Sequence, residues 1–312
     1  MSHSASPSKA RLNGILCGLA SACIWGAFPV VTRLGLTHTP LDGYDITFIR
    51  YAVSGVVLLP YLMRAGLRGL SWKAIALMVA GIGAPYMLVV SFGLSHAPVE
   101  QFAVVTPASM IVFSTLISVW ALGMRFAAQA LAGIAIIILG VALAGYQGLT
   151  SPHASSLAFF IFLAGGLLWA VYTVSSKVYS TSALHGTAVV SVFSMLLYSP
   201  FYLALNGARL LDIPVMDLVV QAVYQGLLVS VAALFFYSSA VQMLGAAIGA
   251  TFAALVPGSA IVLAALMLGE PPNMVAIAGL LIVTTGTAMA LWQRHPAHRA
   301  STPATDPKGV IR

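Results

Sequence analysis

Charged residues are scarce in this sequence. Only 7% of its 312 residues are Asp, Glu, Lys or Arg, and just seven are acidic. Soluble globular domains carry about 25% charged residues, so this composition excludes an ordinary soluble domain. Hydrophobic residues instead make up 60% of the chain, and the mean hydropathy is +0.99. The composition therefore indicates a membrane protein.

Metal-binding and nucleotide-binding motifs are lacking as well. Cys17 and Cys23 lie six residues apart within one apolar run, a spacing that makes no zinc-ligand set. His96 precedes Glu100 by four residues, but Pro98 intervenes and no HExxH motif is formed. No Walker A motif is present, which excludes an ATP-driven pump unless a partner supplies the ATPase. We therefore expect neither a metal nor a cofactor.

Ten apolar runs fill the chain, and most contain about 20 residues, enough for a helix to cross a hydrocarbon core of about 30 Å. The runs lack the alternating pattern of barrel strands, which favours helices. The predicted spans are residues 12–33, 43–63, 72–95, 98–121, 127–146, 155–179, 185–206, 215–242, 245–269 and 273–292. Residues 1–11 and 294–312 contain little apolar surface and are predicted to be disordered tails.

The second half of the chain repeats the first. Trp25 and Arg33 recur as Trp169 and Lys177 at an offset of 144 residues. Further along, Phe102, Ala103, Pro107, Gly123, Gly133 and Gly140 recur as Phe252, Ala253, Pro257, Gly269, Gly279 and Gly286. The repeats are predicted to occupy residues 12–150 and 151–293. Because each repeat holds five spans, the second must enter the membrane from the opposite side, so the two are expected to be inverted, as in many secondary transporters.

Basic residues predict the orientation. With a cytoplasmic amino terminus, only Arg33 and Arg209 fall at outer helix ends, and Arg50 falls inside the second span. The eleven that face the cytoplasm are Lys9, Arg11, Arg64, Arg68, Lys73, Arg125, Lys177, Arg294, Arg299, Lys308 and Arg312. This asymmetry predicts that both termini are cytoplasmic. The net charge of +7 then reflects topology, and no nucleic-acid partner is expected.

Together these features resemble the EamA-type transporters of the drug/metabolite transporter superfamily. The resemblance rests on the tryptophans of spans one and six, Arg50, the prolines of spans four and nine, the Leu268-Gly269-Glu270 ending of span nine and the glycine-spaced fifth and tenth spans. It implies ten helices around a central cavity and alternating access in the bacterial inner membrane. Export of small metabolites, above all aromatic or neutral amino acids, is the implied activity. The first repeat has Met124 where the second has Glu270, so no symmetric role for Glu270 is implied.

Two alternatives stay open. A phosphate-ester or nucleotide-sugar exchanger of the same superfamily should need several cations in its cavity, and the interior offers Arg50 and, nearer the helix ends, Arg33 or Lys177. A membrane-embedded enzyme acting on lipid-linked substrates would need a nucleophile, base or metal set. The short loops provide none, so we do not expect an enzyme. The expected partners are a small-molecule substrate and membrane lipid, with the chain acting as a monomer or weak homodimer.

Breaks in three spans predict hinges around a midplane site. Each of Pro107 and Pro257 removes a backbone hydrogen bond, and their duplicated positions favour a role in the cavity over simple kinks. Gly81, Gly83 and Pro85 weaken span three near its centre.

Aromatic and amide side chains within the spans are the predicted substrate contacts. Trp25 and Trp169 lie in mid-span at equivalent positions, although core packing would be the simpler explanation for either one alone. An apolar ring with a single donor suits a flat or aliphatic substrate. The full set is Trp25, Phe28, Tyr86, Phe102, Trp169, Tyr172, Gln225 and Phe252.

Two charged residues inside the predicted spans need a reason to be there. For Arg50, an outward-reaching pair with Asp42 or Asp45 is favoured over a counter-charge for a substrate carboxylate. For Glu100, interaction with the positive end of the fourth helix is favoured over proton coupling. Arg33 and Lys177 are predicted to end their helices and to serve the scaffold or gating.

Overall fold

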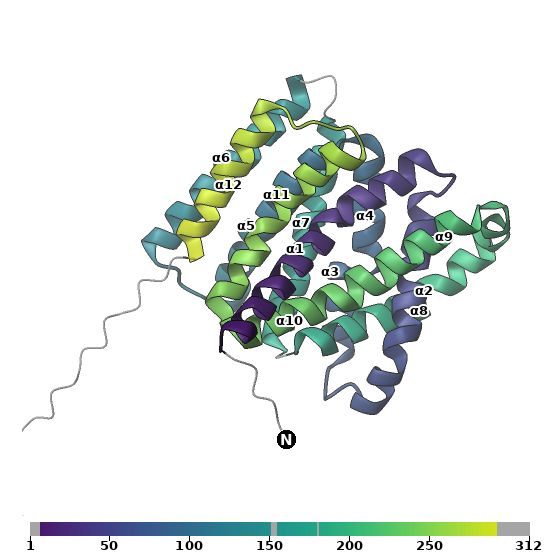
Figure 1. Ribbon diagram of the computed structural model, residues 1–312. Coiled ribbons are helices and arrows are strands. Elements are labelled where there is room, and N and C mark those ends of the chain that lie inside the picture. The colour runs from purple at the N-terminus through teal and green to yellow at the C-terminus, as the bar shows by residue number, and fades with distance from the viewer. Residues whose placement is uncertain (1–6, 151–154, 180, 292–312) are drawn as a thin grey trace, which may run out of the picture.

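A computed structural model describes residues 7–150, 155–179 and 181–291 (Figure 1). This part of the chain consists of helices joined by short turns and contains no strand. In chain order the elements are α1 (Pro7–His38), α2 (Gly43–Ala65), α3 (Trp72–Ile82), α4 (Ala84–His96), α5 (Val99–Leu122), α6 (Ala128–Thr150), α7 (Ser156–Val178), α8 (Ala183–Asn206), the 3-10 helix η1 (Gly207–Asp212), α9 (Val215–Gln221), the π-helix η2 (Ala222–Ala232), α10 (Ala233–Leu244), α11 (Ala246–Met267) and α12 (Met274–Leu291).

Eight stretches of the described residues are long and apolar enough to cross a membrane. They correspond to the first eight predicted spans, with α3 and α4 forming one stretch and α9, η2 and α10 forming another. The apolar parts of the last two helices, Thr251–Met267 and Met274–Ala290, are shorter. The complete helices α11 and α12 contain 22 and 18 residues, so these stretches do not give their full lengths. The count of ten spans stays a prediction.

Two boundaries and one helix type differ from the sequence prediction. α1 begins at Pro7, inside the segment predicted as a disordered tail, because proline is well suited to the first turn of a helix. It also continues to His38, so Arg33 does not end its helix as predicted. Span eight contains a π-helical segment that the sequence did not suggest. Residues 1–6, 151–154 and 292–312, which include the boundary between the predicted repeats and the predicted tail at 294–312, lie outside the described residues.

Polar side chains define where several helices begin. Asp42 accepts hydrogen bonds from the first-turn amides of α2, and the Asp42 amide donates to the Asp45 carboxylate, which completes a capping box. Ser155 and Ser182 cap α7 and α8, each by accepting from the amide three residues later. Asn273 accepts from the Ala276 amide at the start of α12. These caps satisfy amides that have no partner within the helix.

The ends of α5 and α11 have the same conformation. Gly123 and Gly269, at equivalent positions in the two repeats, both have positive φ, of 63° and 66°. Past each glycine, the amide of Met124 bonds to Ser118 and that of Glu270 bonds to Ala264. At both ends the residue after the glycine thus bonds to the carbonyl six positions earlier, and glycine permits the positive φ of this turn because it has no Cβ.

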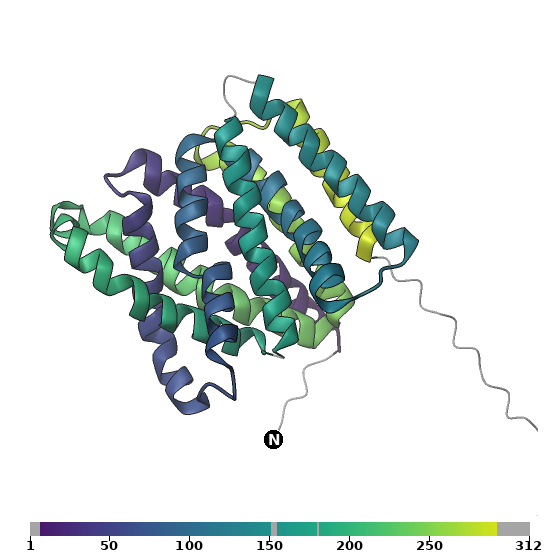
Figure 2. The same cartoon turned by 180° about the vertical axis from the view of Figure 1, so that it is seen from behind.

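Equivalent helices of the two repeats pack against each other in opposite directions. α6 and α12 lie side by side at one edge of the bundle (Figure 1 and Figure 2). Gly133 faces Gly286 and Ala290, whereas Gly140, two turns later, faces Gly279 and Val283. At the opposite edge, Asp45 and Gly55 of α2 meet Tyr202 and Met195 of α8. In each pair, increasing residue number on one helix meets decreasing number on the other, so both pairs are antiparallel.

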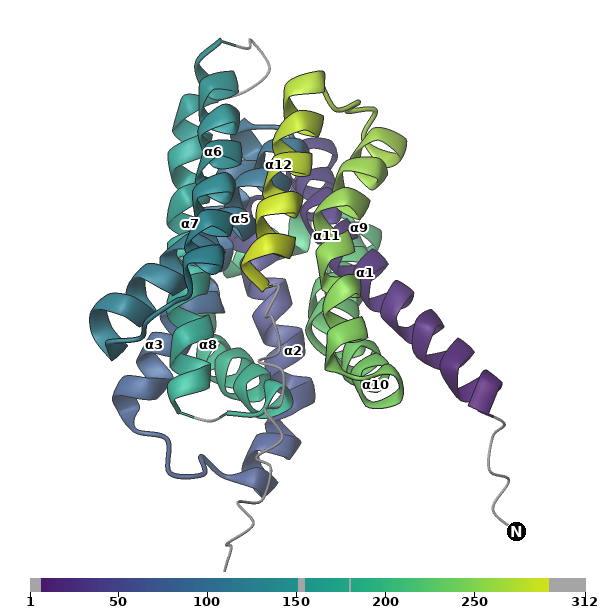
Figure 3. The ribbon, with the colours of Figure 1, turned by 90° about the vertical axis from the view of Figure 1, so that its left-hand side faces the viewer.

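The fourth helix of each repeat, which contains Pro107 or Pro257, packs on the first helix of the other repeat. α11 lies along α1 (Figure 3), where Phe252 covers Gly18 and the Ser259 hydroxyl donates to the carbonyl of Ala22 at 3.2 Å. α5 lies along α7 in the equivalent way, with Phe102 beside Phe162 and Ser109 against Gly166. The two repeats are therefore interlocked and do not form separate bundles.

Four turns and the beginning of α7 meet at one end of the bundle, which we call the Glu270 end. The turns join α1 to α2, α4 to α5, α8 to α9 and α11 to α12. Hydrogen bonds connect them, including one from the Gln101 side chain to Ser155 and one from Arg209 to Pro40. The six acidic residues of the described chain all lie in or next to these turns: Asp42, Asp45, Glu100, Asp212, Asp217 and Glu270.

The contact between α6 and α12 generates a stability prediction. A Cβ at Gly133 would lie 2.5 Å from the backbone nitrogen of Ala290 and 2.6 Å from the oxygen of Gly286. We expect Gly133→Ala to force the helices apart and cost about 1–3 kcal/mol. The measurement is thermal unfolding of the purified protein in detergent. Gly258→Ala is the control, because a Cβ there meets nothing within 4 Å. Equal unfolding temperatures for the two variants would contradict the close packing.

Candidate functional site

Arg50 lies inside the bundle, where four helical elements meet. Its Nη1 donates to Gln225 Oε1 of η2 at 3.2 Å and approaches Met87 Sδ of α4 at 4.0 Å. Its guanidinium carbon lies 5.1 Å from the centre of the Phe28 ring of α1 and 5.7 Å from that of Tyr51. These are cation–π distances. The charge is therefore surrounded by an amide, a thioether and two rings.

Gln225 connects Arg50 to α1. The side chain is completely buried, and its Nε2 donates to Thr32 Oγ1 at 2.9 Å. The Thr32 hydroxyl in turn donates to the carbonyl of Phe28 at 2.7 Å. The sequence predicted Gln225 as a substrate contact; its recorded contacts instead reach Arg50 and Thr32.

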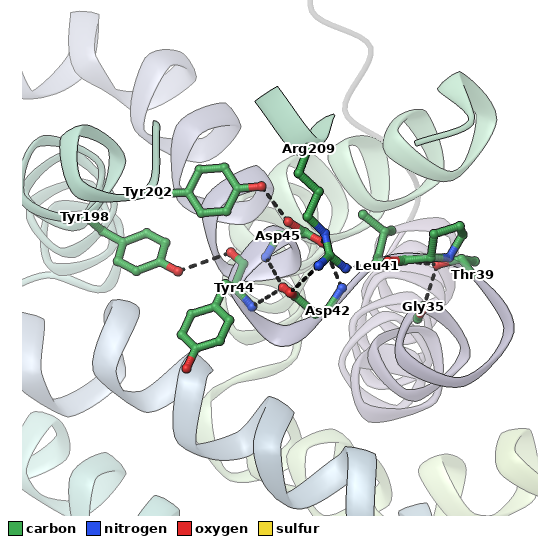
Figure 4. A network of polar contacts seen from close by, with 10 residues as sticks. Gly35, Thr39, Leu41, Asp42, Tyr44, Asp45, Tyr198, Tyr202 and Arg209 are labelled. Atoms are coloured by element: carbon green, nitrogen blue, oxygen red, sulfur yellow. Dashed lines mark hydrogen bonds and ion pairs between the residues drawn. The ribbon is translucent and has the colours of Figure 1, made fainter. Parts of the chain in front are cut away.

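The ion pair favoured for Arg50 from the sequence is wrong. Asp42 and Asp45 pair with Arg209 instead, each at 3.3 Å (Figure 4). Asp45 is fully buried and also accepts from the Tyr202 hydroxyl. Its two oxygens are thus already engaged by η1 and α8. Across residues 7–150, 155–179 and 181–291, no carboxylate lies within 4 Å of the Arg50 guanidinium nitrogens.

Span three is interrupted at Gly83, between α3 and α4. Neighbouring helices satisfy backbone groups on both sides of the break: the Tyr51 hydroxyl donates to the carbonyl of Ile82 at 2.6 Å, and the Ala84 amide donates to Ser194 Oγ at 3.2 Å. Gly81 packs against Tyr172 of α7. Because Tyr51 follows Arg50 directly in α2, its hydrogen bond to Ile82 connects the interruption to the Arg50 site.

The third helix of the second repeat is irregular in a different way. Residues 222–232 form a π-helix, in which the Ser230 hydroxyl donates to the Gln225 carbonyl five residues earlier at 2.9 Å. Such wide turns are rare, and in proteins they occur often at functional sites. No glycine or proline pattern in the sequence signalled this segment.

The two mid-span tryptophans face these irregular segments. Trp25 Nε1 donates to the carbonyl of Val229 in η2 at 3.3 Å. Trp169 makes an edge contact with Tyr86 of α4, with ring centres 6.2 Å apart. Both rings are half-buried and pack against the main buried cluster. Each therefore contacts the third helix of the opposite repeat.

The predicted phenylalanines separate into two places. Phe28 and Phe102 are 6.1 Å apart, and Phe102 continues to Phe162 of α7 at 5.5 Å, which makes an aromatic chain that starts at Arg50. Phe252 instead packs over Gly18 in α1. Its recorded contacts thus hold α11 on α1, and a substrate-binding role for it stays a prediction.

The prolines do not interrupt their helices. α5 continues through Pro107 and α11 through Pro257. Hydroxyls close to each proline donate to backbone carbonyls of the opposite repeat. Thr106 of α5 donates to the carbonyl of Phe162 in α7 at 3.1 Å, and Ser259 of α11 donates to that of Ala22 in α1 at 3.2 Å. The hinge roles of Gly81, Gly83, Pro85, Pro107 and Pro257 stay predictions.

A polar cluster closes the Glu270 end. Arg33 forms an ion pair with Glu270 and donates to the carbonyl of Leu94, and Glu270 also accepts from the Val99 amide at 3.2 Å. Glu100 accepts from the backbone and side-chain amides of Asn273, both at 3.0 Å. The cluster therefore joins α1, the α4–α5 turn and the α11–α12 turn. A proton-coupling role for Glu100 stays a prediction.

One cavity, of about 340 Å³, lies between α6 and α7, apart from Arg50. It is lined by Ala142, Gly145, Tyr146, Ser156, Phe159 and Phe160. None of these residues was predicted to contact substrate, and the central cavity implied by the family resemblance stays a prediction.

Several residues around the site escaped the sequence analysis. Thr32, Tyr51 and Ser194 are polar residues that the structure buries. In the sequence, their only signal was a polar side chain within an apolar span. Asn273 could have been recognised as a helix cap, because it follows two prolines and precedes the last apolar run.

Comparisons with known proteins show the family to which the chain is similar. Residues 12–146 and 156–292 each match the EamA-like transporter family. The chain is 24% identical over 288 residues to the "Uncharacterized transporter YetK" of Bacillus subtilis, covering 89% of this chain and 86% of that one. It is 28% identical over 261 residues to the "Probable terminal-alkyne amino-acid exporter" of Streptantibioticus cattleyicolor, covering 81% and 84%.

A solved crystal structure shows the same fold. It superposes with a TM-score of 0.55 at 17% identity and covers 91% of this chain and 96% of its own. The family matches cover nearly the whole chain, and the membrane-length helices agree with them. The chain belongs to the EamA-like transporter family and is an integral membrane transporter.

Proposed function

We propose that this protein is a ten-helix secondary transporter that exports neutral or aromatic amino acids across a bacterial inner membrane by alternating access. The observation that carries the substrate assignment is the Arg50 guanidinium, which lies inside the bundle with no carboxylate partner among the described residues. Burying an unpaired charge is costly. A substrate carboxylate would remove that cost while it is bound.

The antiparallel packing of equivalent helices supports the inverted-repeat architecture. α2 against α8 and α6 against α12 are the arrangements expected when the second repeat enters the membrane from the opposite side. The matching ends of α5 and α11 and the reciprocal packing of α5 on α7 and α11 on α1 support it further. On this architecture α11 and α12 are the ninth and tenth spans.

Charge distribution supports an orientation with the Glu270 end outside. The acidic residues of the described chain are at that end, and the basic residues Arg64, Arg68, Lys73 and Arg125 lie in or beside the turns at the other end. Positive residues are retained in the cytoplasm, so both termini are assigned to the cytoplasm.

The aromatic residues near Arg50 support an apolar substrate side chain. Phe28 and Phe102 extend from the guanidinium, and Tyr86 and Trp169 belong to or pack against the same buried cluster. A relative at 28% identity is named as an exporter of an amino acid with a terminal alkyne. A carboxylate next to an uncharged side chain fits both observations.

A phosphate-ester exchanger is less well supported. Such a substrate would call for several free cations, whereas Arg33 and Arg209 are paired with carboxylates and Lys177 is exposed. The membrane-embedded enzyme alternative is disfavoured because the matching family and both named relatives are transporters.

Arg50→Gln tests the substrate assignment. We expect labelled neutral amino acids to exchange across proteoliposomes containing the wild type, with an apparent affinity about 10- to 100-fold weaker in the variant, because one charge-assisted contact is lost. The assay is counterflow, with and without an imposed proton gradient. Arg125→Gln, an exposed loop cation, is the control. Exchange unaltered by Arg50→Gln would remove the basis of the proposal.

Glu270→Gln tests closure of the outer side. Loss of a partly buried ion pair should weaken closure by about 1–2 kcal/mol, which raises the population open to the outside by about 5- to 30-fold. The measurement is labelling of a cysteine at Ala97, which is 2% exposed, by an impermeant maleimide in a background without Cys17 and Cys23. Asp212→Asn, an exposed acid at the same end, should leave the labelling rate unchanged. A rate that Glu270→Gln also leaves unchanged would argue against a closing role.

A further inference from the structure

We infer that Gln225 is a positioning residue that leaves one edge of the Arg50 guanidinium free, so that the transporter selects substrates carrying a single carboxylate. The inference rests on the proposed function and assigns its chemical selectivity. It also revises the role of Gln225, which the sequence had suggested as a direct substrate contact.

The hydrogen-bond chain determines how the Gln225 amide points. The Thr32 hydroxyl has one proton, and it is donated to the Phe28 carbonyl at 2.7 Å. The Thr32 oxygen can therefore only accept from Gln225, which must present its NH2 group there, at 2.9 Å. The amide oxygen of Gln225 is then directed at Arg50. If the amide were turned over, its NH2 group would face the N–H donors of Arg50. Arg50 Nη1 donates to this oxygen at 3.2 Å.

The other edge of the guanidinium contains a nitrogen without a hydrogen bond. Nε is buried and makes no hydrogen bond to any described residue, and the one hydrogen bond that Arg50 donates to an oxygen comes from Nη1. The Tyr51 side chain also interacts with Arg50, and its ring centre lies 5.7 Å from the guanidinium carbon. Nε and Nη2 form the side-on pair of parallel N–H donors that matches the two oxygens of one carboxylate. Because Nη1 is occupied by Gln225, only one carboxylate can be bound in this way.

The backbone around Gln225 supports a specialised role. Gln225 lies in the π-helix η2, where its carbonyl accepts from Ser230. Gly226 packs so closely on Val53 of α2 that a Cβ would lie 2.5 Å from it. The wide helix and the missing Cβ together allow η2 to approach α2 near Arg50. A π-turn is less favourable than an α-turn, so its presence at this residue calls for a reason.

Gln221 provides a matched control one turn away. It is equally buried, at 1% exposure, and its Nε2 donates to the Val31 carbonyl of α1 at 3.0 Å. It has no recorded contact with Arg50. Truncation of either glutamine removes a buried amide that contacts α1, but only truncation of Gln225 changes the surroundings of Arg50.

The experiment uses the full-length protein and four related probes. They are L-phenylalanine, L-phenylalaninamide, 3-phenylpropionate and phenylsuccinate, which carry one, no, one and two carboxylates. Affinity is measured by ligand-induced thermal stabilisation in detergent and by competition in counterflow. For the wild type, we expect the two monocarboxylates to bind about 10- to 100-fold more tightly than the amide, and phenylsuccinate to bind no more tightly than 3-phenylpropionate.

Three variants test the positioning role. Gln225→Ala should free Nη1, weaken monocarboxylate binding and raise the affinity for phenylsuccinate relative to 3-phenylpropionate. Gln225→Glu should supply Arg50 with its own carboxylate and abolish the preference for acid over amide. Gln221→Ala should keep both wild-type preferences, even if its unfolding temperature falls as far as that of Gln225→Ala.

The outcomes separate this inference from the proposed function. If amino acids are exchanged but the amide competes as well as the acid, the transport proposal stands and this inference fails. Identical probe preferences in Gln225→Ala and Gln221→Ala would also overturn it. If no carboxylate probe stabilises the wild type and no amino acid is exchanged, both proposals fail.

Discussion

The positive charge of Arg50 is the constraint around which the interior of this protein is arranged. A guanidinium cannot be deprotonated under physiological conditions, so it must be solvated by the protein or by a ligand. Here α1 contributes Phe28 and Thr32, α4 contributes Met87 and η2 contributes Gln225. These groups stabilise the charge without neutralising it. A carboxylate in their place would hold Arg50 more tightly and would exclude an anionic group of a substrate.

Arg33 and Arg209 differ from Arg50 because both are paired with carboxylates of the protein. Arg209 is held by Asp42 and Asp45 (Figure 4). Arg33 is held by Glu270, so each of these two cations has a carboxylate partner within the protein. Those pairs lie at helix ends and connect turns. Removing one partner would leave a carboxylate unpaired, which is why such residues hold the fold together. Arg50 alone among these three has its charge unmatched, and it lies where the two repeats meet.

The frame of the fold was predictable from the sequence because it is recorded in local patterns. Span lengths follow from hydropathy, and the repeated glycines at Gly123 and Gly269 mark matching helix ends. The site was less predictable, because its partners are far apart along the chain. Gln225 and Thr32 are 193 residues apart, and no spacing rule connects them. Nor does composition distinguish a π-helix from an α-helix, so η2 and the direction of Gln225 had to come from the structure.

A symmetric frame carries an asymmetric site, as the proposed monocarboxylate substrate would require. The caps Asp42 and Ser182 begin α2 and α8, and the residues eight positions later are Arg50 and Val190. Val190 is buried and apolar, so the second repeat has no equivalent cation. The third helices differ too, since one is interrupted at Gly83 and the other widens into η2. A second buried guanidinium would need further groups to stabilise it. One guanidinium would suffice for the proposed substrate with a single carboxylate, and apolar packing occupies the position equivalent to Arg50.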